Sequence, residues 1–394
     1  MENLPIVHVV NGRQKKLLQG HPWVYGNEIE RVEGEIEDGG LVTVVDFRGR
    51  YMGTGFYNSK SLITVRLLTH RQEEITDELI ASRVKAACDY RRFVMNRPGT
   101  DSCRLIYGEA DRLPGVIADR FGGVIVLQVL ALGMERFTQT IADALLACEK
   151  PDCLLLQNDD ALRRKEGMEC FTRVLYGTLP EENIIHENGV KLAVDVLGGQ
   201  KTGYFLDQKD NHLFVRQFCK DARVLDCFSY IGAFALNAAA AGAKEVTAVD
   251  ISEAAVQLIE KNAALNGAEI TAVCANCFDY LRAQVKAGEK YDVVVLDPPA
   301  FTKAHANMAS ACRGYKEIAL SAMRLLPAGG VLATHSCSYH MPEEVFVNTV
   351  LSAAQDLHRQ VRIITLRRQD IDHPVLAGYP ESHYLKSLWL QMLD

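Results

Sequence analysis

Residues 223–232 read RVLDCFSYIG, an apolar strand pattern that runs into a turn and then into a helical pattern. The alternation continues downstream, with strand patterns at 223–228, 245–250, 270–274, 291–296 and 330–335 and helical patterns at 232–241, 252–266, 278–287 and 314–326. This spacing predicts an α/β fold, a Rossmann-like parallel sheet with helices on both faces. Such sheets bind ligands beyond the C-terminal ends of their strands, where the strand order reverses. We therefore expect the functional residues at the strand ends.

The sequence before this alternating region follows different patterns. Residues 1–73 contain short apolar runs separated by glycine-rich or acidic turns, which predicts a small β-barrel-like module. Residues 74–180 begin with a helical pattern at 76–96 and continue with strand and helix patterns. We expect three domains: the barrel-like module at 1–73, an α+β unit at 74–180 and the alternating domain at 181–394.

The composition excludes several classes of protein. The 394 residues are 48% hydrophobic and 24% charged, as in ordinary globular proteins. No apolar run approaches the ~20 residues that a membrane-spanning helix needs, and the first ten residues lack the pattern of a secretory signal. The eleven cysteines follow no paired framework, so we expect free thiols in a reducing compartment, the cytoplasm.

The net charge of −7 speaks against a general affinity for nucleic acid, but the basic residues are unevenly spread. Between residues 83 and 104, six Lys and Arg residues stand against only two Asp residues. This stretch, with Arg91 and Arg92 near its centre, predicts a local basic face that could bind RNA. A solvated helix face without a partner fits the same pattern equally well.

A second mixture of basic and aromatic residues lies near the N-terminus. Lys15 and Lys16 precede His21, Trp23 and Tyr25, a combination suited to phosphate pairing and base stacking. Trp23 and Tyr25 fit a barrel core equally well.

The first strand pattern indicates which ligand the C-terminal domain binds. It ends at Asp226 in a turn that lacks the G-x-G-x-x-G loop of dinucleotide-binding folds. The second strand pattern ends at Asp250, 24 positions later, where a carboxylate can accept hydrogen bonds from ribose hydroxyls. These features favour an adenosine ligand without phosphates, and S-adenosylmethionine fits, since acidic side chains suit its positive sulfur. A helix-capping role explains Asp250 equally well.

The fourth strand pattern ends in the sharper signal Asp297-Pro298-Pro299-Ala300-Phe301. Two prolines fix their own φ angles and push Asp297 toward extended geometry, so its carboxylate is held rigidly at the strand end. Such a turn suits a flat base, whose amino group and ring nitrogen the carboxylate and a backbone carbonyl could bind. A plain proline turn with a surface aspartate is the competing interpretation.

The fifth strand pattern ends near Cys337, within Ser336-Cys337-Ser338. Carbon 5 of a pyrimidine is a poor nucleophile until a thiolate adds to carbon 6, and a cysteine beside a carboxylate supplies that chemistry. A single free cysteine is more often a small core residue, and Cys312 is a rival nucleophile.

Metal binding is not expected. Cys274 and Cys277 have C-x-x-C spacing, but no second pair stands at the spacing of a zinc ribbon. His305 and Cys312 could complete a metal site only if the fold happened to bring them close to Cys274 and Cys277.

Several of these motifs together resemble the RlmI-type 23S ribosomal RNA cytosine-5 methyltransferases. The resemblance rests on residues 224–230, 297–301, 311–316 and 336–338, and also on 200–208 and 372–374. It covers nearly the whole chain and implies a PUA domain, a linking α+β domain and a methyltransferase domain. It further implies a homodimer, S-adenosylmethionine as methyl donor, and Cys337 and Asp297 as catalytic residues.

The resemblance, the strand-end pattern and the two basic stretches together give the full set of candidate binding residues. For the donor these are Gln208, Asp226, Phe228, Tyr230, Gly232, Asp250, Ile251, Asn276, Asp279 and Asp297. For the RNA they are Pro298, Pro299, Phe301, Lys15, Lys16, Arg91 and Arg92.

The chain departs from the wider pattern at Ala300, where many RNA cytosine-5 methyltransferases carry a second cysteine that helps to release product. Relatives with the same three-domain layout also methylate guanine. A guanine methyltransferase acting at N7 or N2, with Cys337 structural, is therefore an alternative. A non-catalytic RNA-binding factor in ribosome assembly is a second alternative, whereas the missing glycine loop disfavours a nicotinamide dehydrogenase.

Overall fold

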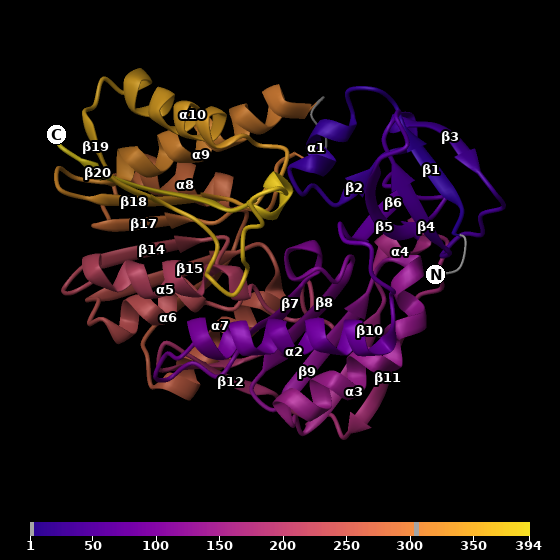
Figure 1. The fold of residues 1–394 in the computed structure, drawn as a ribbon. Coiled ribbons are helices and arrows are strands. Elements are labelled where there is room, and N and C mark those ends of the chain that lie inside the picture. Colours follow the sequence, from indigo (N-terminus) through magenta and orange to yellow (C-terminus); the bar gives the residue numbers. More distant parts are fainter. Residues whose placement is uncertain (1–3, 303–306) are drawn as a thin grey trace.

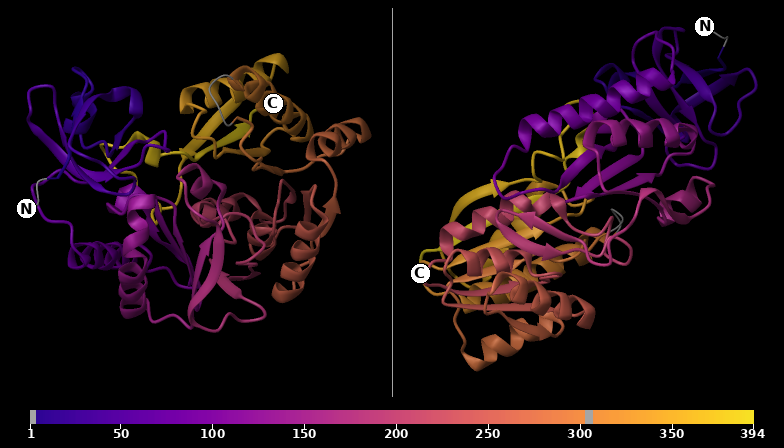
Figure 2. Two further views of the ribbon diagram at one scale, coloured as in Figure 1. Left: turned by 90° about the vertical axis from the view of Figure 1, so that its right-hand side faces the viewer. Right: turned by 90° about the horizontal axis from the view of Figure 1, so that it is seen from below.

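The computed structural model describes residues 4–302 and 307–394, which form three large sheets in succession along the chain and a two-stranded sheet between the second and the third (Figure 1). The N-terminal and C-terminal ends of the chain lie at opposite ends of the molecule (Figure 2). Within the described residues, no helix is long and apolar enough to cross a membrane. All eleven cysteines are free thiols.

The N-terminal sheet has six strands in the order β2-β6-β5-β4-β1-β3. Its elements are β1 (Ile6–Val9), α1 (Gln14–Leu18), β2 (Trp23–Val24), β3 (Ile29–Glu33), β4 (Leu41–Val45), β5 (Tyr51–Tyr57) and β6 (Val65–Thr69). Four of the strands, β1, β4, β5 and β6, overlap the apolar runs of the sequence at 6–10, 41–46, 54–57 and 62–68. The sequence pattern missed β2 because it has two residues, and β3 because four of its five side chains are exposed.

The central sheet has five strands in the order β11-β10-β9-β8-β7, with two helices packed together beside it (Figure 1). Its elements are α2 (Asp77–Val94), β7 (Cys103–Tyr107), β8 (Val116–Phe121), β9 (Val124–Val129), α3 (Thr138–Glu149), β10 (Cys153–Asn158), α4 (Ala161–Lys165) and β11 (Phe171–Gly177). Thr76 caps α2 by accepting a hydrogen bond from the Leu79 amide at 3.3 Å. A hairpin of β12 (Ile184–Glu187) and β13 (Val190–Ala193) leads to the C-terminal domain.

Three of the six basic residues predicted to form a face at 83–104 are buried, whereas Lys85 and Arg92 stay exposed. Arg83, Arg91 and Arg104 are 3%, 1% and 7% exposed, because tertiary contacts give each guanidinium a buried partner. Arg91 pairs with both oxygens of Asp111 at 2.6 and 2.8 Å and is therefore not available to RNA. A count of charges along the sequence could not foresee this, since the partner lies 20 positions away.

The C-terminal sheet has seven strands in the order β16-β15-β14-β17-β18-β20-β19. The strands are β14 (Arg223–Cys227), β15 (Glu245–Asp250), β16 (Thr271–Cys274), β17 (Val293–Leu296), β18 (Val331–Ser336), β19 (Val361–Arg367) and β20 (Lys386–Met392). The helices are α5 (Lys209–Val215), α6 (Ala233–Ala240), α7 (Glu253–Asn266), α8 (Cys277–Ala287), α9 (Met308–Leu325) and α10 (Glu343–Asp356). Helices α5 and α6 cover one face and α8, α9 and α10 the other (Figure 1).

Two features of this sheet matter for the site. The first five strands are parallel, as predicted, whereas β20 runs antiparallel to β18 and β19 antiparallel to β20, which the sequence pattern did not predict. The order reverses between β14 and β17, because β15 and β16 extend on one side of β14 and the later strands on the other. A ligand is therefore expected beyond the ends of these two strands.

Candidate active site at the reversal of strand order

A cavity of about 330 Å³ lies beyond the C-terminal ends of β14, β15 and β17. The register explains why: Cys227 pairs with both Val249 and Leu296, so the residues that follow these three strands lie side by side. The predicted site residues on its wall are Gln208, Phe228, Tyr230, Asp250, Ile251, Asn276, Asp297, Pro298, Pro299, Phe301 and Cys337.

The turn after β14 is held in an uncommon conformation. Phe228 and Tyr230 have φ angles of 62° and 51°, which cost side chains other than glycine roughly 1–2 kcal/mol each. Asp250 supports the turn, because its carboxylate accepts hydrogen bonds from the Tyr230 amide at 3.0 Å and the Ser252 amide at 2.9 Å. The carboxylate also borders the cavity and keeps lone pairs for a ligand. Asp250 thus fixes the turn and the start of the segment before α7 (Glu253–Asn266), while Ser252 is the N-cap of that helix.

Three predicted donor residues lie off the cavity wall. Asp226 is completely buried behind the turn and accepts hydrogen bonds from the Ser229 hydroxyl at 2.5 Å and the Ala235 amide at 3.2 Å. Gly232 has a φ of 87° and begins α6. Asp279 points to solvent with 71% of its side chain exposed and pairs with Arg282. The strand-end rule correctly predicted that Asp226 lies near the end of a strand. It could not predict that its side chain is buried behind the turn and does not line the cavity.

The chemistry of the wall suits an adenosine group. Phe228, Ile251 and Phe278 supply apolar surface, Asp250 supplies a carboxylate, and Asn276 supplies an amide at the start of α8. A largely apolar cavity with a few fixed polar groups, of roughly 300 Å³ or more, is typical of a cofactor site. These residues would hold S-adenosylmethionine.

Asp297 is held at the end of β17 by its neighbours. Gln208 donates to it at 3.1 Å, and Asn211 fixes the Gln208 amide by donating to its oxygen at 2.6 Å. Burial, followed by the negative charge of Asp207, raises the pKa of Asp297 to about 7. This carboxyl can therefore gain or lose a proton near neutral pH.

Cys337 lies at the end of the adjacent strand β18 and lines the same cavity. Burial, followed by the negative charge of Asp297, raises the pKa of its thiol to about 11. The turn around it is fastened on both sides: Ser336 bonds the Tyr315 hydroxyl at 2.9 Å, and the Ser338 hydroxyl donates to the Thr302 carbonyl at 2.9 Å.

The sequence did not single out Lys386, which reaches this turn from β20. Its ammonium donates to the Ser338 carbonyl at 2.6 Å and to the Tyr384 carbonyl at 2.7 Å. Burial lowers its pKa to about 8, while the nearby Cys337 acts in the opposite direction. Lys386 lies in an antiparallel pair with Ser336, and the sequence pattern gave no sign of that pairing.

The segment at 200–208 supplies further wall residues that the sequence did not name individually. They are Gln200, Tyr204, Phe205 and Asp207. Burial alone would raise the pKa of Asp207, but Lys201, at 2.9 Å, and other neighbours hold it well below its usual value. His212 on α5, which also lines the cavity, bonds Glu187 at 2.7 Å.

The other sequence candidates lie elsewhere. Lys16 pairs with Glu28 at 2.6 Å in the N-terminal module, which also carries the exposed Lys15. Arg92 is half exposed and pairs with Asp89 at 2.6 Å and Glu149 at 2.9 Å.

Of the other cysteines in the part of the chain that the structure describes, Cys277 also lines the cavity. Cys312 lies on α9 against the hydrophobic core, away from the cavity wall. Cys277 accepts a hydrogen bond from the Phe228 amide at 3.2 Å. Among residues 4–302 and 307–394, no three His, Cys, Asp or Glu side chains form a group that could hold a metal ion, and His305 lies outside this range.

Comparisons with known proteins agree with this geometry. A family model of PUA-like domains matches residues 7–70, and a model of S-adenosylmethionine-dependent methyltransferases matches residues 125–369. Ribosomal RNA large subunit methyltransferase I of Klebsiella pneumoniae (strain 342) is 42% identical over 97% of both chains. The protein of that name from Salmonella arizonae is 40% identical over 98% of this chain and 96% of its own.

Solved structures show the same fold. A proposed S-adenosylmethionine-dependent methyltransferase from Streptococcus mutans and the proposed methyltransferase SMU.776 complexed with SAH each match with a TM-score of 0.84. Both are 20% identical and cover 98% of this chain and 99% of their own. The expected Rossmann-like fold with a PUA-like N-terminal domain is confirmed.

Proposed function

The chain belongs to the S-adenosylmethionine-dependent ribosomal RNA large subunit methyltransferase I family, and from this premise we propose that it methylates carbon 5 of a cytosine in 23S ribosomal RNA. The observation that carries the cytosine assignment is the position of Cys337 and Asp297 on one cavity wall, at the ends of adjacent strands. A thiol and a proton-sharing carboxyl are the two groups that activation of cytosine requires.

The first step is the addition of sulfur to the base. The thiol pKa of about 11 means that Cys337 carries its proton near neutral pH, while Asp297 can exchange one. We infer that the thiol proton passes to Asp297 and from there to nitrogen 3 of cytosine as sulfur bonds to carbon 6. Asp297 takes up one proton and gives one away, so it ends the addition in the protonation state in which it began.

Carbon 5 then carries the electron density that accepts a methyl group, and the donor supplies an electrophilic methyl carbon. Loss of the carbon-5 proton to a base re-forms the double bond to carbon 6 and expels the sulfur as a thiolate. The proton on nitrogen 3 returns through Asp297 to this thiolate, which restores the free thiol. Pro298, Pro299 and Phe301 border the cavity beside Asp297, where we place the flat face of the target base.

Lys386 supports the thiolate in this scheme. Its ammonium bonds the carbonyl of the residue after Cys337, and a positive charge at that point lowers the free energy of the thiolate. Lys386 is a positioning residue because it acts through the Cys337 turn.

The remaining parts of the proposal concern partners. The PUA-like module at 1–73 and the α+β unit at 74–180 would hold the RNA while the target base is turned into the cavity. We also propose a homodimer, as the family resemblance implies, which sedimentation of the purified chain would test.

Covalent trapping tests the mechanism. RNA that carries 5-fluorocytosine keeps its carbon-5 fluorine, so the sulfur cannot be expelled and a denaturant-resistant complex accumulates. We expect this complex with the unaltered chain and none with Cys337→Ala, whereas Cys312→Ala should still form it. Full methylation of cytosine by Cys337→Ala would overturn the mechanism, and methylation found on guanine at N7 or N2 would overturn the substrate.

A further inference from the structure

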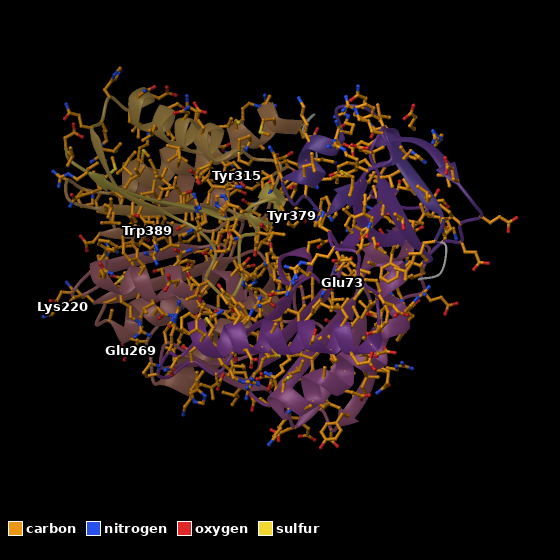
Figure 3. All side chains as sticks on the ribbon, in the orientation of Figure 1. Glu73, Lys220, Glu269, Tyr315, Tyr379 and Trp389 are labelled. Atoms are coloured by element: carbon orange, nitrogen blue, oxygen red, sulfur yellow. The ribbon has the colours of Figure 1, made fainter. Side chains whose placement is uncertain are left out.

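A second cavity, of about 640 Å³, lies apart from the donor cavity and shares no lining residue with it. All three parts of the chain form it: Trp23 and Arg66 come from the N-terminal sheet, Glu109 from the central domain and Tyr379 from the segment before β20. Figure 3 shows Tyr379 between the N-terminal and C-terminal parts of the molecule. Nothing in the proposed reaction uses this cavity.

The cavity has rigid, flat walls. The rings of Trp23 and Tyr379 meet edge to face with centroids 4.8 Å apart, and the Trp23 indole donates to Glu109 at 2.8 Å. The Arg66 guanidinium lies 5.6 Å from the centre of the Trp23 ring. Aromatic rings and guanidinium planes are the surfaces on which proteins stack unpaired bases.

The polar groups of the second cavity are held in place by ion pairs, but one of their hydrogen-bond donors still lacks an acceptor. Arg66 bridges two buried carboxylates, Glu109 at 2.9 Å and Glu166 at 3.1 Å. Its Nε is buried and lacks a hydrogen-bond partner among the residues that the structure describes. A buried donor without a partner is costly unless a ligand supplies an acceptor, and a base carries such acceptors on its edge.

Two lysines border the cavity. Lys60 and Lys165 are both exposed, and neither pairs with a carboxylate within residues 4–302 and 307–394. Leu62 adds apolar surface beside them, with 89% of its area exposed. Unpaired lysines next to stacking surfaces suit a nucleotide, whose phosphate carries negative charge and whose base is flat. An acidic peptide would not need the aromatic wall.

We propose that this cavity binds an unpaired nucleotide of the RNA substrate, distinct from the nucleotide that is methylated. The base lies against Trp23 and Arg66, and its phosphate lies near Lys60 and Lys165. The proposal rests on the proposed function only in that RNA is the substrate.

The segment at 379–385 connects the two cavities. Tyr379 borders the second cavity and Leu385 the donor cavity, while Tyr107 donates to the Ser382 carbonyl at 3.3 Å between them. Glu381 of the same segment bonds His21 of the N-terminal module at 3.2 Å. A nucleotide in the second cavity would therefore fix the position of the RNA relative to Cys337.

Tryptophan fluorescence can report on this cavity. The chain has two tryptophans, and Trp389 is fully buried in the C-terminal domain, so Trp23 is the one that a ligand here can reach. We would titrate the full chain with short single-stranded RNA, with S-adenosylhomocysteine at saturation to block the donor cavity. The expected result is a saturable change in emission that disappears in Trp23→Phe, a variant that keeps an aromatic ring.

A charge-reversal pair tests the lysines. In the double variant Lys60→Glu, Lys165→Glu we expect the Kd for this RNA to rise at least about tenfold. The slope of log Kd against log salt should fall by about 0.7, since one phosphate of a single strand is no longer neutralised. The matched control is Lys220→Glu, Lys286→Glu, which reverses two exposed lysines of the C-terminal domain and should leave both values unchanged (Figure 3 labels Lys220).

Three results would overturn the proposal: no change in Trp23 emission on addition of RNA, an equal loss of affinity in the control pair, or a response to an acidic peptide but not to RNA. These measurements need no methyl transfer. The proposal that the second cavity binds a nucleotide can therefore be wrong while the proposal of cytosine methylation is right, and the reverse also holds.

Discussion

Two groups of buried aspartates in this molecule have opposite properties. At the donor cavity, Asp226 is completely buried and Asp297 is partly buried. Neither has a Lys or Arg partner among the described residues, and desolvation raises the pKa of each to about 7. At the junction of the central and C-terminal domains, Asp119 and Asp372 are completely buried. Arg104 pairs with Asp119 at 2.8 Å and Lys209 with Asp372 at 2.5 Å, and these cations hold the pKa of both carboxyls below its usual value despite burial.

The difference shows that burial alone does not decide what a carboxylate does. Where a cation is in contact, the charge is kept and the pair joins elements from different domains, as Asp372 does by also accepting from the Arg104 amide at 2.8 Å. Where a cation is absent, the group exchanges a proton near neutral pH and is suited to catalysis.

The largest effect is expected from Asp297→Asn. The amide keeps the shape of the side chain but cannot pass a proton to the base, so kcat should fall about 10²–10⁴-fold. Single-turnover methylation of RNA measures this rate. The matched control is Asp119→Asn, which should lower stability and leave the rate per folded molecule within severalfold. Equal losses of rate in both variants would contradict the distinction between the two groups.

The sequence predicted the first group and not the second, for a physical reason. Asp226, Asp250, Asp297 and Cys337 each follow an apolar strand pattern, and parallel strands bring their C-terminal ends to one edge. The order of strand patterns along the sequence was therefore enough to predict that these residues lie at the same edge of the sheet. The partners of Arg91, by contrast, come from residues 20 and 281 positions away, and only the folded chain brings them together.

The same limit applies within the site. The segments at 200–208 and 379–386 fold back over the cavity from outside the alternating region, so strand-end reasoning could not place Tyr204 or Lys386. The domain limits at 73 and 180 stay predictions, although each sheet lies within one of the predicted ranges.

A slightly smaller effect is expected at the domain junction. Lys209→Met removes the cation of a buried pair and leaves Asp372 uncompensated, which should lower the free energy of unfolding by about 3–5 kcal/mol. Denaturant unfolding measures it. Lys261→Met, which breaks the half-exposed pair with Glu182, should change stability little. If both variants unfolded alike, the Lys209 pair would not hold the domains together.

The pH dependence of stability should separate the groups further. The folded-state pKa of Asp297 is raised to about 7, so its protonated form is favoured in the folded chain. The stability that this group contributes is present below its unfolded pKa and is lost as pH rises from about 4 to about 7. Asp297→Asn should therefore become more stable than the unaltered chain across this window, by up to about 4 kcal/mol. A constant difference between the two chains from pH 4 to pH 8 would refute the raised pKa.

A more moderate effect is expected from Lys386→Met. Without the ammonium, the Cys337 thiolate loses its positive neighbour, so the rate of trapping by 5-fluorocytosine RNA should fall about tenfold near neutral pH, and its pH profile should move to higher pH. Lys386→Arg keeps the charge and should restore most of the rate. An unchanged pH profile in the methionine variant would leave Lys386 a purely structural residue.

The smallest effect concerns the two carboxylates that the sequence assigned alike to the donor. Asp250 borders the cavity, whereas Asp279 is turned to solvent beside Arg282, so only the first can bind a ribose. Asp250→Asn should weaken S-adenosylhomocysteine binding about tenfold, the cost of one charged hydrogen bond. Asp279→Asn should leave the calorimetric Kd unchanged. Because Asp250 also accepts from the Tyr230 and Ser252 amides, equal melting temperatures for the two variants are needed to assign the loss to the ligand. If Asp279→Asn weakened binding as much, the exposed carboxylate would have to turn inward when the donor binds.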